Sequence, residues 1–330
     1  MSLTSLAIAF LVAWGLTGIT LALARRYHVV DAPNLRSSHA LPTPTLGGCA
    51  ILGATLIGAW CGGAQGLSSL VAASLLLLFF VVDDLCRPLG VTIKAGVQLL
   101  SATVWVVMSH FSVIHLPVIG LIGGLGVSIL AVLWLVAWMN AFNFMDGIDS
   151  ISSTQTIVAG VSLAAIFSYL APDLQALPLC LAAAAAGFLV FNLPPARIFM
   201  GDVGSAFLGL CFGVITLQAM SVGLSALLIV LPLGLYVYDT SLTILRRAGK
   251  RENILRAHRQ HLYQRLVQRG WSHGSVSLTV GILSAAFGAS AWSAVSGRIE
   301  LAILLGLSAS ATLVVGSIAT WRQAEGSSDA

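Results

Sequence analysis

Residues 70–82 read Leu-Val-Ala-Ala-Ser-Leu-Leu-Leu-Leu-Phe-Phe-Val-Val, a stretch with serine as its one polar side chain. A strand of a membrane barrel alternates apolar and polar positions, whereas this stretch is apolar on every side. Similar apolar runs, close to the roughly 20 residues that cross a bilayer as a helix, recur along the chain. The chain is 58% hydrophobic and 8% charged, with a mean hydropathy of +0.96. These features predict an all-α, polytopic transmembrane bundle, because helices satisfy their own backbone hydrogen bonds in lipid.

We predict eleven spans, with the N-terminus outside and the C-terminus in the cytoplasm. The spans are expected near residues 2–24, 46–64, 67–82, 95–110, 123–141, 154–171, 175–191, 204–220, 223–243, 275–296 and 299–320. Residues 111–122 are apolar but contain His115, Pro117 and Gly120, so we expect an outer loop or half-helix there. A count of ten spans remains open. The first apolar run lacks the basic start of a signal peptide, so we expect it to stay as a span.

The distribution of charge supports eleven spans. With this topology fifteen of the sixteen lysines and arginines lie on the inner side and only Arg298 lies outside, as the positive-inside rule requires. Residues 1–330 then form a single membrane domain without a soluble part. The five cysteines are scattered and form no C-x-x-C pair, so they indicate neither a disulfide framework nor a metal site. We expect the active site in the inner loops near residues 25–45, 83–94, 142–153, 192–203 and 244–274.

Two adjacent carboxylates, Asp83 and Asp84, follow the apolar run of the third predicted span, and Lys94 opens the next span. An acidic side chain costs about 2.5–3.5 kcal/mol at the bilayer centre and less at the interface, so it usually has a partner or a function. An ordinary helix end that meets water explains one aspartate. Two in succession beside a lysine favour a functional site.

The fifth predicted span ends in Asn140-Ala-Phe-Asn143-Phe-Met-Asp146-Gly147-Ile-Asp149. At intervals of three, Asn140, Asn143 and Asp146 share one face of a helix. Aligned oxygens suit a hard cation or a ribose and base. A capped turn rich in Asn, Asp and Gly is the alternative, but it explains only one or two of these residues.

Asp202 lies between glycines, in Gly201-Asp202-Val-Gly204-Ser205, just before a predicted helix. Glycine lets a ligand approach the backbone closely, and a helix N-terminus offers unpaired N–H groups to an anion. A simple N-cap is the commoner explanation of a single turn of this kind. Because this is the third acidic loop on the same side, we expect Asp202 to bind a metal ion while the helix end binds phosphate.

A basic loop near the C-terminal end reads Ala-His258-Arg259-Gln-His261-Leu-Tyr-Gln-Arg. The two histidines and Arg259 offer hydrogen-bond donors suited to a diphosphate. Polybasic inner loops often do no more than fix the topology or contact anionic lipid, which is the alternative for the arginines. The apolar positions that follow are compatible with an amphipathic helix on the membrane surface.

The first inner loop, residues 31–48, contains three prolines and carries Arg36 and His39. Its rigidity suits a binding wall and equally suits a plain connector. Four further histidines have no partners nearby in the sequence, and we assign them structural roles: His28, His110, His115 and His273.

These motifs, in this order and over nearly the whole chain, resemble those of the polyprenyl-phosphate N-acetylhexosamine-1-phosphate transferases, the glycosyltransferase 4 family of the MraY and WecA proteins. The resemblance implies Mg²⁺, with Mn²⁺ as a substitute, a UDP-N-acetylhexosamine donor, and undecaprenyl phosphate as acceptor, with UMP released. It implies a bacterial inner membrane, a cytoplasmic active site, membrane lipid around the chain and no nucleic acid. The oligomeric state stays open, with a homodimer as one option.

Tyr263 and Gln264 stand where some relatives in this family have histidine. The chain therefore resembles less the peptidoglycan-precursor and GlcNAc-transferring branches than the bacterial members that start O-antigen or other surface polysaccharides. Those members use UDP-linked N-acetylfucosamine, N-acetylquinovosamine or related sugars.

The resemblance and the residue chemistry together give the expected roles. The expected catalytic residues are Asp83, Asp84, Asp146 and Asp149. The expected substrate-binding residues are Arg36, His39, Lys94, Asn140, Asn143, His258, Arg259 and His261. The expected metal ligands are Asp202, Asp84 and Asp146. A cation-coupled transporter or lipid flippase is the alternative function, and it predicts acids at the midplane on broken helices in paired halves of the chain.

Overall fold

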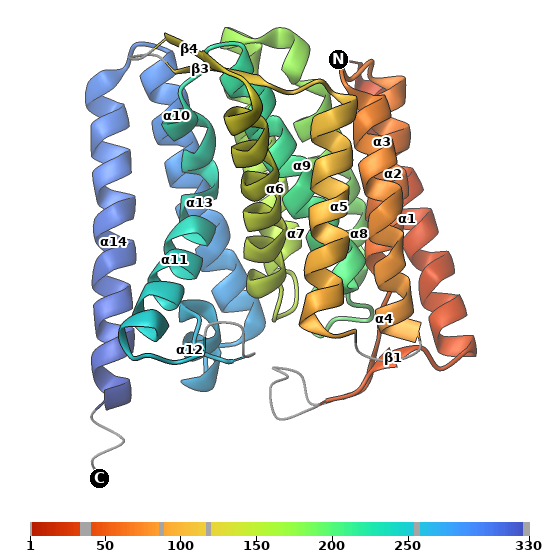
Figure 1. The fold of residues 1–330 in the computed structure, drawn as a ribbon. Coiled ribbons are helices and arrows are strands. Elements are labelled where there is room, and N and C mark those ends of the chain that lie inside the picture. Colours follow the sequence, from red (N-terminus) through yellow and green to blue (C-terminus); the bar gives the residue numbers. More distant parts are fainter. Residues whose placement is uncertain (1, 34–40, 86–88, 117–119, 254–257, 326–330) are drawn as a thin grey trace.

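The computed structural model describes residues 2–33, 41–85, 89–116, 120–253 and 258–325, drawn as a ribbon in Figure 1. Within these residues the chain forms a bundle of roughly parallel and antiparallel helices with two very short hairpins. The long helices are α1 (Leu3–Arg26), α2 (Gly47–Cys61), α3 (Leu67–Leu77), α5 (Val91–Met108), α6 (Leu125–Met145), α7 (Ile151–Leu170), α8 (Ala176–Asn192), α9 (Gly201–Ser221), α11 (Gly234–Gly249), α13 (His273–Val295) and α14 (Ile299–Glu325).

Shorter elements extend or connect these helices. Helix α3 continues through η1 (Leu78–Phe80) into α4 (Val81–Leu85), and α10 (Ala226–Val230) continues through η3 (Leu231–Leu233) into α11. The turn η2 (Pro172–Leu174) precedes α8, and α12 (Leu262–Gln268) follows α11. The strands pair as antiparallel hairpins, β1 (Val30–Asp31) with β2 (Thr43–Pro44) and β3 (Val113–Leu116) with β4 (Gly120–Gly123).

The all-α, polytopic fold predicted from the sequence is confirmed. Each of the eleven predicted spans coincides with a helix or a helical run. Nine of the described helices are long and apolar enough to cross a membrane. Two shorter apolar helical runs, Gly47–Cys61 and Leu67–Asp83, correspond to the second and third predicted spans. Residues 111–122 were predicted as an outer loop or half-helix, and the β3–β4 hairpin begins within them and ends at Gly123, which pairs with Val113.

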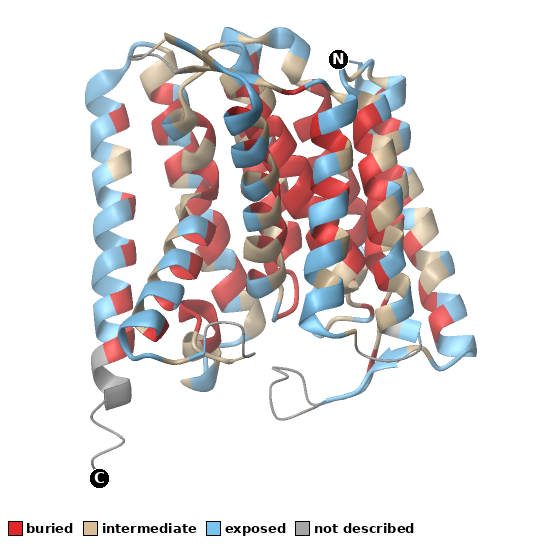
Figure 2. Cartoon of the chain, in the orientation of Figure 1, coloured by how far each residue is buried: buried red, intermediate tan, exposed pale blue. Residues whose placement is uncertain are grey.

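Helix α9 lies at the centre of the bundle, with 89% of the residues in its most apolar stretch buried. It packs closely against α6, because Gly209 has no side chain and a Cβ there would overlap the backbone of Met139. In contrast, few residues are buried in the peripheral helices α1, α5 and α14, and α5 and α14 are mostly pale blue in Figure 2. Large apolar side chains such as Leu304 and Leu307 are among those exposed, as expected for a lipid-facing surface.

The two ends of the bundle differ. One end carries α4, α12 and the last described turn of α14 and is here called the site face, while the other carries the β3–β4 hairpin and the start of α1 (Figure 1). At the site face the start of α2 is bonded to the segment before α9, through Gly47 N to Phe199 O (2.9 Å) and Gly48 N to Met200 O (2.8 Å). A Cβ on Gly48 would overlap the backbone of Gly204, so glycine lets the starts of α2 and α9 touch.

Candidate active site

Two carboxylates from distant parts of the chain meet at one lysine on the site face. The Lys94 Nζ atom lies 2.8 Å from Asp83 Oδ2 and 2.5 Å from Asp202 Oδ2. The three side chains are partly exposed, at 30% for Lys94, 13% for Asp83 and 24% for Asp202. An ammonium shared by two carboxylates makes two charge-assisted hydrogen bonds and leaves one net negative charge.

The local backbone explains why these groups converge. Asp83 belongs to α4, and its Oδ1 accepts a hydrogen bond from the backbone N–H of Leu89, which closes the connection toward α5. Lys94 lies in the first turn of α5. Asp202 is the second residue of α9, where the positive end of the helix dipole favours a carboxylate.

The end of α6 supplies an amide to the same cluster. Asn143 Nδ2 donates to Asp202 Oδ1 at 2.8 Å and to Ser205 Oγ at 3.2 Å. Asn140, one turn earlier on α6, instead donates to Gln98 Oε1 of α5 and to the carbonyl of Val136, both at 2.8 Å. Asn143 therefore orients Asp202, whereas Asn140 joins α6 to α5.

Asp146 directly follows the last residue of α6 and is only partly exposed. Burial of its carboxyl group, opposed by a hydrogen bond with Ser152 and reinforced by the negative charge of Asp202, raises its pKa to about 7. Asp146 thus lies within the electrostatic influence of the Asp83–Lys94–Asp202 cluster. A cation placed between Asp146 and Asp202 would favour the ionised form of both.

Asp149 ties three segments of the site face together. Its Oδ2 lies 3.3 Å from Nδ1 of His273 at the start of α13 and accepts the backbone N–H of Ala196 at 3.1 Å. Its carbonyl accepts the hydroxyl of Ser277 at 2.8 Å, and its side chain is buried. Asp149 is therefore placed to order the loops around the site, and His273, assigned a structural role from the sequence, is its partner.

Residues 258–261, here called the histidine loop, pack against the end of α6. His261 is 2% exposed, and its ring stacks on Phe144 with centroids 5.9 Å apart and lies 5.0 Å from the ring of His258. Burial, together with the neighbouring His261 and Arg247, lowers the pKa of His258 to about 4. His258 is therefore a neutral imidazole near neutral pH, and it can donate one hydrogen bond rather than carry a charge.

Two residues that the sequence reasoning did not select hold this loop. Asp239 of α11 is 1% exposed, and its Oδ1 lies 3.3 Å from Nδ1 of His261. Tyr263 donates its hydroxyl to the carbonyl of Phe144 at 3.0 Å. An acid inside an apolar span is costly, and this cost indicated a function for Asp83. The same reasoning, applied to Asp239, would have predicted a role for it from the sequence.

Not every predicted site residue falls within the described part of the chain. Arg36, His39 and the side chain of Asp84 lie outside the described residues. Arg259 is partly exposed in the histidine loop, and its carbonyl accepts a hydrogen bond from Gln268 Nε2 at 3.0 Å.

The carboxylates at the site face fit a divalent cation that is shared with a substrate. Among the described residues, no three His, Cys, Asp or Glu side chains come close enough to form an all-protein metal cage. Mg²⁺ is usually held by one or two carboxylates together with substrate phosphates and waters. Asp202 with Asp146 or Asp83 offers such a partial set of hard oxygen ligands.

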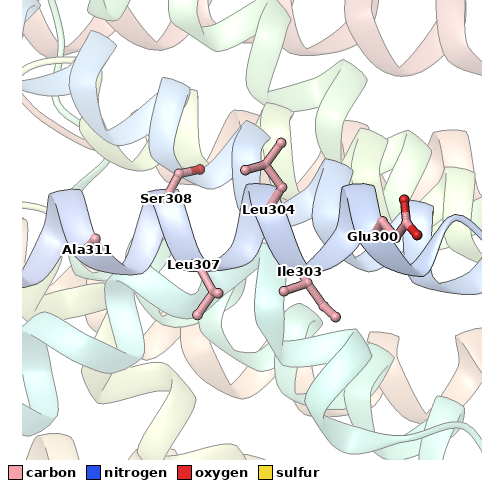
Figure 3. A pocket seen from close by; sticks show the side chains of 6 residues that line it. All are labelled: Glu300, Ile303, Leu304, Leu307, Ser308 and Ala311. Carbon is pink, nitrogen blue, oxygen red and sulfur yellow. The ribbon is translucent and has the colours of Figure 1, made fainter.

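A shallow apolar hollow lies on α14, apart from these residues (Figure 3). Its lining side chains all come from that one helix: Glu300, Ile303, Leu304, Leu307, Ser308 and Ala311. The hollow contains none of the predicted site residues and belongs to the exposed surface of a peripheral helix.

The fold defines a class, a polytopic helical membrane protein, and this one gathers carboxylates and a lysine at one end of its bundle. Residues 67–220 match the model of glycosyl transferase family 4. The chain is 31% identical to the decaprenyl-phosphate N-acetylglucosaminephosphotransferase of Mycolicibacterium smegmatis, over 85% of this chain and 79% of that protein.

Two further relatives agree with this match. The chain is 29% identical to the probable undecaprenyl-phosphate N-acetylglucosaminyl 1-phosphate transferase of Bacillus subtilis, over 88% of this chain and 84% of that protein. It is 31% identical to the phospho-N-acetylmuramoyl-pentapeptide-transferase of Lactiplantibacillus plantarum, over 74% of this chain and 82% of that protein. The chain belongs to glycosyl transferase family 4 and is a glycosyl-1-phosphate transferase.

Proposed function

We propose that this enzyme transfers N-acetylhexosamine-1-phosphate from a UDP-sugar to undecaprenyl phosphate, giving the polyprenyl-diphosphate sugar and UMP. The observation that carries the proposal is the cluster in which Lys94 joins Asp83 and Asp202 at the site face. The names of the three relatives, all transferases of a phosphorylated amino sugar or its derivative, support it.

The chemistry is a displacement at phosphorus. An oxygen of the lipid phosphate attacks the β-phosphorus of the UDP-sugar, a new P–O bond forms, and the bond to the UMP oxygen breaks. A phosphate monoester has a second pKa near 6, so the attacking oxygen is largely ionised at neutral pH. The enzyme therefore needs to neutralise charge and to align two anions more than it needs a strong base.

The clustered residues have roles that suit this reaction. Asp202, with Asp146 or Asp84 as the next candidate, would hold Mg²⁺, which when bound neutralises charge on the phosphates. Lys94 binds a phosphate oxygen, and Asp83 orients the lipid phosphate or removes its last proton. Asn143 keeps Asp202 in place through the 2.8 Å hydrogen bond, and Asp149 orders the loops around the donor.

The histidine loop is the proposed wall for the donor diphosphate. His258, His261 and Arg259 come from one loop that packs on α6 beside Asn143. Arg36 and His39 of the first inner loop are further candidates for contacts with substrate. Neutral His258 donates a single hydrogen bond, so Arg259 supplies most of the positive charge in this loop.

We place the enzyme in the bacterial cytoplasmic membrane, with the site face in the cytoplasm. The predicted distribution of lysine and arginine supports this orientation. Tyr263 and Gln264 support a role in starting a surface polysaccharide such as O-antigen, with a UDP-linked N-acetylated sugar as donor.

The test is release of UMP by the purified protein from a panel of UDP-N-acetylhexosamines in the presence of undecaprenyl phosphate. We expect UMP release that requires the lipid and a divalent cation, with one donor preferred. The proposal fails if no donor gives cation-dependent UMP release and if Asp202→Asn supports the glycan in cells as well as the wild type.

A further inference from the structure

Asp239 is a buried carboxylate in helix α11, with 1% of its surface exposed. Its Oδ1 accepts hydrogen bonds from the backbone N–H of Leu262 at 2.9 Å and from the hydroxyl of Thr243 at 3.1 Å. Its Oδ2 accepts the backbone N–H of Tyr263 at 3.3 Å. Burying a charge is costly unless it is well paired, and these donors together with His261 compensate the cost.

The contact with Asp239 determines which ring nitrogen of His261 carries a proton. Asp239 Oδ1 lies 3.3 Å from Nδ1 of His261, and a carboxylate can only accept a hydrogen bond. A hydrogen bond between these two atoms requires the proton on Nδ1, and Nε2 is then the ring nitrogen that remains for another partner. Carboxylates commonly orient histidines in this way, and they fix the tautomer of histidines that bind a ligand or take part in catalysis.

The residues that Asp239 holds are joined in turn to the carboxylate cluster. The His261 ring stacks on Phe144, the neighbour of Asn143, and Tyr263 donates to the carbonyl of Phe144 at 3.0 Å. Asn143 in turn donates to Asp202. A short chain of contacts thus runs from Asp239 through His261 to the end of α6 that holds the carboxylate cluster.

We propose that Asp239 is a positioning residue for the transferase reaction: it holds the imidazole of His261 with Nε2 available to the donor diphosphate and anchors the start of α12 to α11. This inference rests on the proposed function. Asp239 does not itself touch substrate in this scheme, and its effect on the reaction is exerted through His261.

A purely structural role is the competing explanation, because Asp239 also caps α12. The two roles are separated by a double-mutant cycle. Asp239→Asn keeps an oxygen for the amide of Leu262 but replaces the charged carboxylate beside Nδ1 by a neutral amide. His261→Asn keeps a polar group near the position of Nδ1 and removes Nε2.

The kinetic experiment measures kcat and KM for the donor in the wild type, both single variants and the double variant. We expect each single variant to lose about ten- to a hundredfold in kcat/KM, the range seen when a residue that orients a functional group is removed. We expect the double variant to be no more than about threefold worse than His261→Asn. Asp173→Asn, at an exposed turn on the opposite end, serves as the control and keeps wild-type kinetics.

Equal losses of kcat/KM from Asp239→Asn in the wild type and in the His261→Asn variant would overturn the positioning role, as would a wild-type rate for Asp239→Asn.

Amide hydrogen exchange of residues 258–268 tests, without using activity, whether Asp239 anchors α12. We expect faster exchange at Leu262 and Tyr263 in Asp239→Ala and no change in Asp173→Ala. Unchanged exchange in Asp239→Ala overturns the anchor, whereas a wild type without UMP release but with this exchange pattern refutes only the proposed reaction.

Discussion

Replacing Lys94 by glutamine should remove the ammonium group that lies between Asp83 and Asp202. Lys94 makes hydrogen bonds of 2.8 and 2.5 Å to these carboxylates. A hydrogen bond to a charged group is worth about 1.5–3 kcal/mol, but these side chains are 13–30% exposed, which reduces each contribution to about 1 kcal/mol. The variant should therefore lose about 2 kcal/mol of folding free energy, with a lower unfolding temperature.

A divalent cation should reverse much of this loss. In the wild type Mg²⁺ must compete with the Lys94 ammonium for the two carboxylates, whereas in Lys94→Gln it meets them without that competitor. Mg²⁺ should consequently raise the unfolding temperature of the variant more than that of the wild type. UMP release should fall by about 10²–10³-fold, the loss typical of removing one group that stabilises charge in the transition state.

The assay is thermal unfolding in detergent with EDTA or Mg²⁺, together with UMP release. The matched control is Lys250→Gln, which removes the chain's other lysine from an exposed position after α11. The reasoning is refuted if Lys94→Gln and Lys250→Gln unfold at the same temperature with EDTA and gain equally from Mg²⁺.

Three further predictions concern single residues. Asp202→Asn should lower kcat by about 10²–10³-fold while the protein still folds, measured by UMP release and by size-exclusion chromatography. Gly48→Val should prevent folding at the contact with Gly204, because the added side chain would overlap backbone, and the amount of monodisperse protein reports this. The lowered pKa of His258 means that the unfolded chain binds more protons between about pH 4 and 6.5, so His258 makes stability fall as the pH falls through that window. Thermal unfolding from pH 7 to 4 should show a smaller loss of stability in His258→Asn than in the wild type, and equal losses would contradict this assignment.

The membrane spans could be predicted from the sequence because lipid leaves the backbone few alternatives. The apolar run of residues 70–82 is helical from α3 through the start of α4, as its composition requires. The hairpin in residues 111–122 was less predictable, since a short apolar run with proline and glycine fits several structures.

The partners within the site could not be predicted, because they come from distant parts of the chain. Lys94 and Asp202 are 108 residues apart, and no local pattern connects them. The spacing of Asn140 and Asn143 predicted that they share one helix face, but it could not show that Asn140 donates its hydrogen bond to Gln98 instead of facing the carboxylate cluster. Asp239 could have been found from the sequence, because it is the one acidic residue in the apolar span of residues 223–243.

The close packing of α9 on α6 at Gly209 has a consequence for how such enzymes diversify. These helices supply Asp202 and Asn143, and their backbones touch, so this part of the site cannot shift without disturbing the core. The histidine loop, by contrast, is attached through side chains, chiefly Asp239 and Tyr263. Under the proposed function, substitutions in the loop can therefore change how the donor is bound while Asp202 and Asn143 stay in place, so that donor binding can evolve as a separable trait.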